Sequence, residues 1–68
     1  MDIALARTFL EIVACGNFVR AAERLHVTQT AVSVRVQTLE ELLGAKLFVR
    51  NKAGASLTPA GEQFMRYA

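Results

Sequence analysis

A row of hydrogen-bonding side chains is the part of this 68-residue sequence best suited to recognition chemistry. Gln29, Ser33 and Gln37 recur every four residues, so in a helix they form one polar row, with Thr30 and Val34 next to it. A DNA major groove admits an α-helix, and amide side chains can pair there with adenine or with other base edges. The row therefore predicts a surface that reads a nucleic acid.

The sequence gives no comparable support for catalysis or metal binding. Cys15 is the only cysteine and His26 the only histidine, and neither has a partner at metal-ligand spacing. Cys15 falls on the apolar side of a helix, where a small buried hydrophobic residue is expected. No nucleophile is paired with a base, and no glycine-rich phosphate loop is present. We expect a non-enzyme with no catalytic residue, cofactor or metal.

The recognition row requires a helix that holds it away from the core. The spacing predicts a helix over residues 29–43, with Thr28 as its cap and Gly44 as its end. Its apolar residues form one narrow core stripe, made of Val32, Val36, Leu39 and Leu43. A shorter helix over residues 18–25, capped by Asn17, precedes it, and two helices joined this closely make a helix-turn-helix candidate.

The flanking segments complete the fold. A first helix is expected from a cap at Asp2 to an end at Gly16. After the third helix, residues 46–50 and 55–58 predict a hairpin, in which three residues are expected to face inward or pack between strands: Leu47, Val49 and Leu57. Thr58 then caps another helix with Pro59 at its first position. The order of helices and hairpin predicts a mainly α winged helix-turn-helix.

Charge and composition give weaker indications. The net charge is only +2, with a pI near 9.2, so arrangement matters more than total charge. Three acidic residues are expected to lie away from the basic surface, namely Glu40, Glu41 and Glu62. No membrane segment or signal peptide is indicated, which predicts a cytoplasmic protein without a membrane partner.

Six segments in this order resemble one family. They are Arg7-Thr8-Phe9 and the segments at residues 16–22, 25–33, 39–44, 47–50 and 57–61. Together they resemble the N-terminal domain of LysR-type transcriptional regulators, which are bacterial proteins, over nearly the whole chain. The resemblance implies a DNA-binding domain at residues 1–58 and the start of a linker helix at residues 59–68.

The resemblance also implies partners. It predicts a partly palindromic promoter site in double-stranded DNA and a homodimer or tetramer formed through the linker helix. A small-molecule effector would bind only a C-terminal domain that follows these residues in the family, and the DNA-bound protein would be nucleoid-associated. Phe64, Met65 and Tyr67 would serve either the domain core or the dimer seam.

Residue roles follow from the resemblance and from side-chain chemistry. Relatives read a base at the position of Gln29, while Thr28 caps the helix and can also touch phosphate. Ser33 is expected to reach a base or a phosphate, and Gln37 to meet the backbone. Thr30 stands where relatives often carry Pro or Ser.

Val34 stands where many relatives carry a basic residue. An outward valine cannot hold a phosphate, so we expect it to pack against a thymine methyl group. Arg20 is expected to anchor a phosphate, and Arg50 and Lys52 to follow the backbone or enter the minor groove. The modest charge and the residue at Val34 leave one alternative, a winged-helix module that binds protein and has lost DNA binding.

Overall fold

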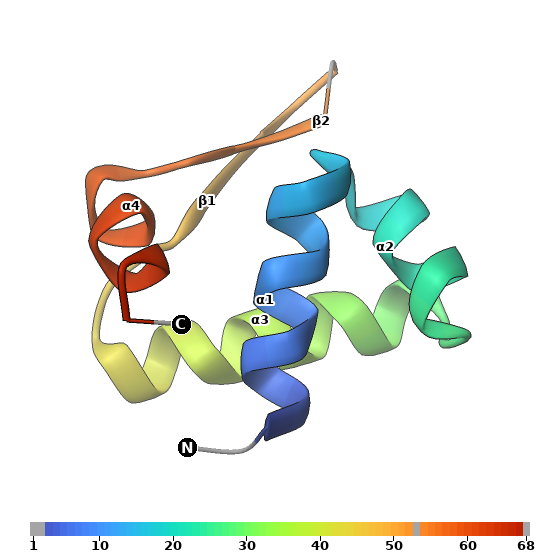
Figure 1. The fold of residues 1–68 in the computed structure, drawn as a ribbon, viewed down its shortest axis with the longest axis horizontal. Coiled ribbons are helices and arrows are strands. Elements are labelled where there is room, and N and C mark those ends of the chain that lie inside the picture. The colour runs from blue at the N-terminus through green and yellow to red at the C-terminus, as the bar shows by residue number, and fades with distance from the viewer. Residues whose placement is uncertain (1–2, 53, 68) are drawn as a thin grey trace.

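The computed structural model describes residues 3–52 and 54–67 and has four helices and one hairpin (Figure 1). The elements in chain order are α1 (Ile3–Cys15), α2 (Phe18–Leu25), α3 (Gln29–Leu43), β1 (Phe48–Asn51), β2 (Gly54–Leu57) and α4 (Pro59–Met65). In Figure 1, α1 crosses α3, α2 lies on the right and α4 on the left, and the hairpin runs from beside α4 to above the upper end of α1. The predicted order of elements is confirmed.

Local caps explain why α2 and α3 begin and end where the sequence predicts. The Asn17 side chain accepts hydrogen bonds from the backbone N–H groups of Val19 and Arg20, at 2.7 and 3.1 Å. The Thr28 hydroxyl accepts one from the Ala31 N–H at 3.0 Å, which satisfies an amide that lacks a partner within the helix. Gly44 ends α3 in the left-handed conformation. The cap predicted at Asp2 lies outside the described residues.

Aromatic rings join α1, β1 and α4 in the core. The Phe9 ring of α1 lies 5.2 Å from the ring of Phe48 in β1 and 4.8 Å from that of Phe64 in α4, the latter edge to face. Val32, Val36 and Leu39 of α3 are buried as predicted. Leu43 was expected to complete that stripe but is 43% exposed, because it is the last residue of α3 and borders an open hollow beside Tyr67.

The inward face of the hairpin differs from the prediction. The two strands are antiparallel and pair Phe48 with Leu57. Leu47 is buried, as expected, but it lies in the connection before β1. Because it is not part of the strand, its burial does not tell which residues of β1 face inward. Phe48 faces the core and Val49 is 55% exposed. The inward prediction for Val49 is therefore wrong.

The returning strand of the hairpin is attached to the turn between α1 and α2. The Ala55 N–H donates to the Gly16 carbonyl at 3.0 Å. Gly54 makes this approach possible, because its φ is +140° and a Cβ there would collide with the Gly16 carbonyl oxygen. The hairpin is thus fixed to the helices on the side of β2 as well as through the Phe48 ring.

Candidate nucleic-acid interface

The outer edge of α3 presents the predicted recognition row. Gln29, Thr30 and Gln37 are exposed, and Ser33 is half-buried. Val34 is 55% exposed. The buried residues of α3 are Val32, Val36 and Leu39, and the polar row lies about a quarter-turn around the helix from them, so its outer members face solvent as the sequence predicts.

A hollow of about 220 Å³ separates α3 from β1. Ser33 and Gln37 line it from α3, while Arg50 lines it from β1 and Lys46 from the connection between them. Two amide or hydroxyl groups and two cations thus share one hollow. Such a surface can hydrogen-bond base edges and hold phosphate oxygens at the same time.

Arg50 is held in place by an aromatic ring. Its Cζ atom lies 4.3 Å from the centroid of the Phe18 ring, a cation–π contact. The same ring packs edge to face with Phe48 at 5.6 Å. Phe48 and Arg50 are two residues apart in β1 and so share one face of the strand. The guanidinium group is therefore positioned before any ligand arrives.

The remaining predicted basic residues lie in two places. Lys52 and Arg50 line a second hollow of about 200 Å³, which includes Asn17 and Gly54. Ala53, at the predicted tip of the wing, lies outside the described residues. Arg20 is exposed on α2 but lines neither of these hollows. The structure brings Ser33 and Gln37 of the α3 row together with Arg50 of the wing, and Arg20 is not among the residues that line that hollow.

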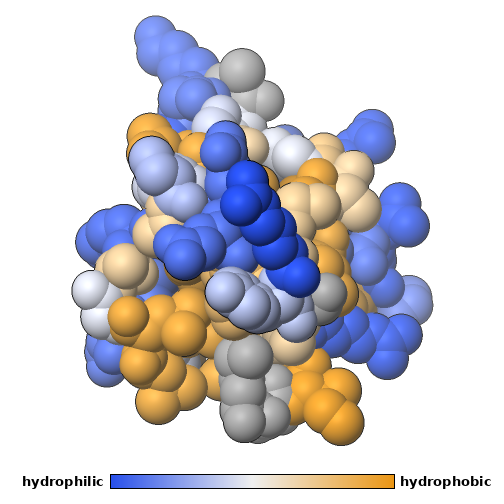
Figure 2. All heavy atoms as spheres, turned by 60° about the vertical axis from the view of Figure 1, so that its left-hand side comes forward, coloured by the Kyte–Doolittle hydropathy of each residue, from blue (hydrophilic) through white to orange (hydrophobic). Residues whose placement is uncertain are grey.

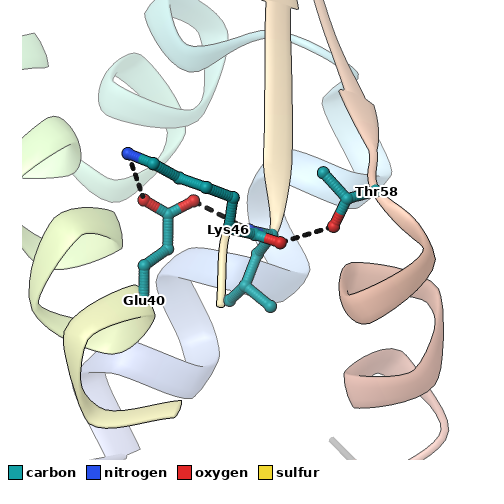
Figure 3. Close-up of polar contacts among 4 residues, drawn as sticks. Glu40, Lys46 and Thr58 are labelled. Carbon is teal, nitrogen blue, oxygen red and sulfur yellow. Dashed lines mark hydrogen bonds and ion pairs between the residues drawn. The ribbon is translucent and has the colours of Figure 1, made fainter. Parts of the chain in front are cut away.

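Glu40 was expected to lie away from the basic surface, and that expectation is wrong. It lines the hollow between α3 and β1 together with Arg50. Its Oε2 atom accepts a hydrogen bond from the Leu47 N–H at 2.8 Å, and its Oε1 atom lies 3.8 Å from the Lys46 Nζ (Figure 3). The buried Leu47 N–H requires an acceptor, and this hydrogen bond keeps the carboxylate there.

Thr58 closes the other side of this connection. Its hydroxyl donates to the Lys46 carbonyl at 2.5 Å (Figure 3) and accepts from the Gly61 N–H at 3.0 Å, which confirms the predicted cap of α4. Its own N–H donates to the Leu47 carbonyl at 2.9 Å. The start of the hairpin is therefore bonded to α3 on one side and to the start of α4 on the other.

Sequence reasoning missed Glu40 and Lys46 as parts of this surface. A signal was present, since Glu40 follows Ser33 by seven residues and Gln37 by three, which places all three on one face of a helix. The position of Lys46 depends on the path of the connection after Gly44, which no periodicity describes. Cys15 also differs from expectation, because it is half-buried and its Sγ lies 3.7 Å from Glu11 Oε1.

The three residues considered for a dimer seam separate into two groups. Phe64 is 8% exposed and belongs to the core, where it packs against Phe9. Met65 and Tyr67 are exposed, and so are Leu42 and Leu43 at the end of α3. Figure 2 looks toward the side of α4 and shows apolar surface gathered in its lower half. Phe64 is therefore part of the core, whereas Met65 and Tyr67 are exposed and can contact a partner.

Within residues 3–52 and 54–67, no helix combines the length and apolar character needed to cross a bilayer. In the same part of the chain, no group of three or more histidine, cysteine or acidic side chains is arranged to hold a metal ion.

Known proteins match this chain over its whole length. The HdfR HTH-type transcriptional regulator of Yersinia enterocolitica is 52% identical over 68 residues, which are all of this chain and 23% of the regulator. The CbnR DBD in a crystal structure with DNA superposes with a TM-score of 0.93 at 36% identity, over 98% of this chain and 77% of that one. The BenM DBD bound to catB site 1 DNA gives 0.91 at 34% identity, over 98% and 75%.

The family assignment rests on the sequence match together with this geometry. The chain spans about a quarter of the length of the curated relatives it matches. The model of bacterial regulatory helix-turn-helix proteins of the lysR family matches residues 3–62. The prediction of a regulatory protein rather than an enzyme agrees with that match. The chain belongs to the LysR family of bacterial helix-turn-helix regulators.

Proposed function

We propose that the chain binds double-stranded DNA in a sequence-specific manner, as the DNA-binding part of a transcription regulator. The observation that carries this proposal is the hollow where Ser33 and Gln37 of α3 meet Arg50 of the wing. A helix in the major groove needs such a polar edge, and a neighbouring cation neutralises the phosphates that flank the groove. CbnR and BenM, which share this fold, are DNA-bound in their crystal structures.

Each candidate residue receives a role in this proposal. Five residues on the outer edge of α3 read base edges or reach the adjacent backbone: Gln29, Thr30, Ser33, Val34 and Gln37. Arg50 and Lys52 bind the backbone or the minor groove from the wing, and Arg20 holds a phosphate beside α2. Thr28 caps α3 with its hydroxyl, so any phosphate contact that it makes is secondary.

The proposal extends to the longer protein. We infer a homodimer or tetramer on a partly palindromic promoter site, with residues 59–68 as the start of the linker helix and exposed Met65 and Tyr67 in its seam. The curated relatives are about four times as long as this chain, which leaves room for an effector-binding domain. Such a regulator works in the bacterial cytoplasm, on the nucleoid when bound.

The test is a binding assay with promoter fragments selected from the host genome, followed by fluorescence anisotropy across a salt series. Phosphate contacts make the logarithm of the affinity fall linearly with the logarithm of the salt concentration. Gln29→Ala is expected to lose about 1–3 kcal/mol of discrimination between the selected site and a scrambled site. Gln63→Ala removes an exposed amide of α4 that lines neither hollow of the proposed interface, and is expected to bind as the unchanged chain does.

Two results would overturn the proposal. One is the absence of binding to any fragment at low salt, which would favour the alternative of a protein-binding module. The other is equal discrimination by the Gln29→Ala and Gln63→Ala variants, which would remove α3 as the reading element.

A further inference from the structure

A second concentration of positive charge lies away from the α3 row. A hollow of about 340 Å³ opens where α1, α2 and α3 meet, and its lining includes Arg7, Arg24, Arg35 and His26. Each arginine comes from a different helix, and His26 comes from the turn between α2 and α3. Among residues 3–52 and 54–67, no acidic side chain lines it.

Two of these arginines lack a counter-charge. Arg24 forms an ion pair with Glu11, so its charge is already balanced. Within residues 3–52 and 54–67, neither Arg7 nor Arg35 has a carboxylate within ion-pair distance. Arg35 is half-buried, and its one hydrogen bond there runs from Nη1 to the Thr8 hydroxyl at 3.4 Å. A guanidinium group has five N–H donors, so most of its binding capacity is open.

We propose that this hollow binds a small oxyanion, either a phosphate or a carboxylate group, between Arg7 and Arg35. The planar fork of a guanidinium matches both of these groups and binds them with two parallel hydrogen bonds. Arg35 supplies the deeper contact beside Thr8, and Arg7 supplies the contact nearer to solvent. An anion held there bridges α1 and α3, and so stabilises the folded chain.

The site is separate from the DNA surface proposed above. Ser33 and Arg35 are two residues apart, which turns their side chains about 200° from one another around α3. Ser33 faces the hollow beside the wing, whereas Arg35 faces α1. The oxyanion site therefore stays open when the row on α3 meets DNA, and its existence does not depend on DNA binding.

The test is a titration of the chain with sodium phosphate, and separately with succinate, at constant ionic strength set with chloride. Bound anion stabilises the native state, so at ten times the half-saturating concentration the Tm is expected to rise by about 5–10 °C. The amide resonances of Thr8, His26 and Val27 are expected to shift along the same saturation curve. A response to phosphate alone, to succinate alone or to both supports the site and identifies the group it takes.

Variants distinguish anion binding in this hollow from a general effect of anions on the Tm. Arg35→Gln and Arg7→Gln are expected to abolish the saturable rise in Tm, and Arg66→Gln, on an exposed residue after α4, is expected to retain it. If Arg35→Gln fails to fold, the Tm series of Arg7→Gln still tests the site, because Arg7 is exposed and its replacement is expected to leave the fold intact. An equal rise in all variants, or no saturable rise in the unchanged chain, would overturn the proposal.

DNA binding provides the final control. Arg7→Gln is expected to leave the affinity for a selected promoter fragment unchanged. A parallel loss of phosphate and DNA binding would make the hollow part of the DNA surface and would overturn the separate site. Failure of DNA binding in the unchanged chain, with the phosphate response intact, would count against the proposed function alone.

Discussion

At the scale of single residues, Val34 is one of two positions on the outer edge of α3, with Thr30, where a departure from the commoner pattern of the family is expected. It is exposed on α3, one turn from the cap-proximal Thr30. An apolar side chain there has no hydrogen bond to offer a base. The chemistry it can offer is contact with the methyl group of a thymine.

This predicts a methyl-dependent contact. When each thymine of a selected site is replaced in turn by uracil, one replacement per half-site is expected to weaken binding by about fourfold, the value of one buried methyl group. The Val34→Ala variant is the control, since its shorter side chain is expected to reduce the difference in affinity between the thymine and uracil sites. Uniform affinity of the unchanged chain for all uracil-substituted sites would rule out the contact.

Single residues also show which features the sequence predicts and which it does not. The polar row of α3 is predictable because it depends only on helical spacing. The contact of Arg50 with Phe18 is not, since it joins residues from β1 and α2 that meet only in the folded chain. The same holds for Glu40, whose position on the helix is predictable but whose partner at Leu47 is not.

At the scale of elements, the joint between α3 and the hairpin depends on the Glu40 carboxylate. Glu40→Ala leaves the Leu47 N–H without its acceptor in a buried position. Such a loss costs about 1–3 kcal/mol, so the Tm of the variant is expected to fall by several degrees and the Leu47 amide to exchange faster. Glu40→Gln keeps an acceptor oxygen and is expected to recover most of the loss.

Glu41 supplies the matched control for this prediction. It is the next residue of α3, is exposed, and is expected to tolerate alanine with a change within about 0.5 kcal/mol. If Glu40→Ala and Glu41→Ala unfold at the same temperature, the hairpin is held by its apolar contacts and the carboxylate is dispensable.

The bounds of α2 and α3 were predictable to the residue, but the end of α4, at Met65 rather than beyond residue 68, and the inward face of the hairpin were not. The bounds of α2 and α3 follow from caps at Asn17, Thr28 and Gly44, which act within a few residues of chain. The inward face of β1 depends on where the strand begins. Because Leu47 is buried outside the strand, its alternation with Val49 gave the wrong face, and Phe48 takes the inward position instead.

At the scale of the whole molecule, α4 belongs to the core of the domain as well as marking the proposed start of a linker. Phe64→Leu is expected to destabilise the chain by about 1–1.5 kcal/mol, because the ring that packs on Phe9 is lost. Met65→Ala changes the exposed neighbour and is expected to stay within about 0.5 kcal/mol. Urea unfolding of the two variants measures the difference, and equal midpoints would place Phe64 outside the core.

The arrangement of the four phenylalanine rings has a consequence during synthesis. Phe9 and Phe18 emerge from the ribosome early, but the rings that cover them come from β1 and α4, near the end of this chain. The helix-turn-helix is therefore translated before the residues that complete its core. A nascent chain that ends before Phe48 carries the α3 row on a core without two of its four rings, so we expect the proposed DNA binding to require that α4 has left the exit tunnel.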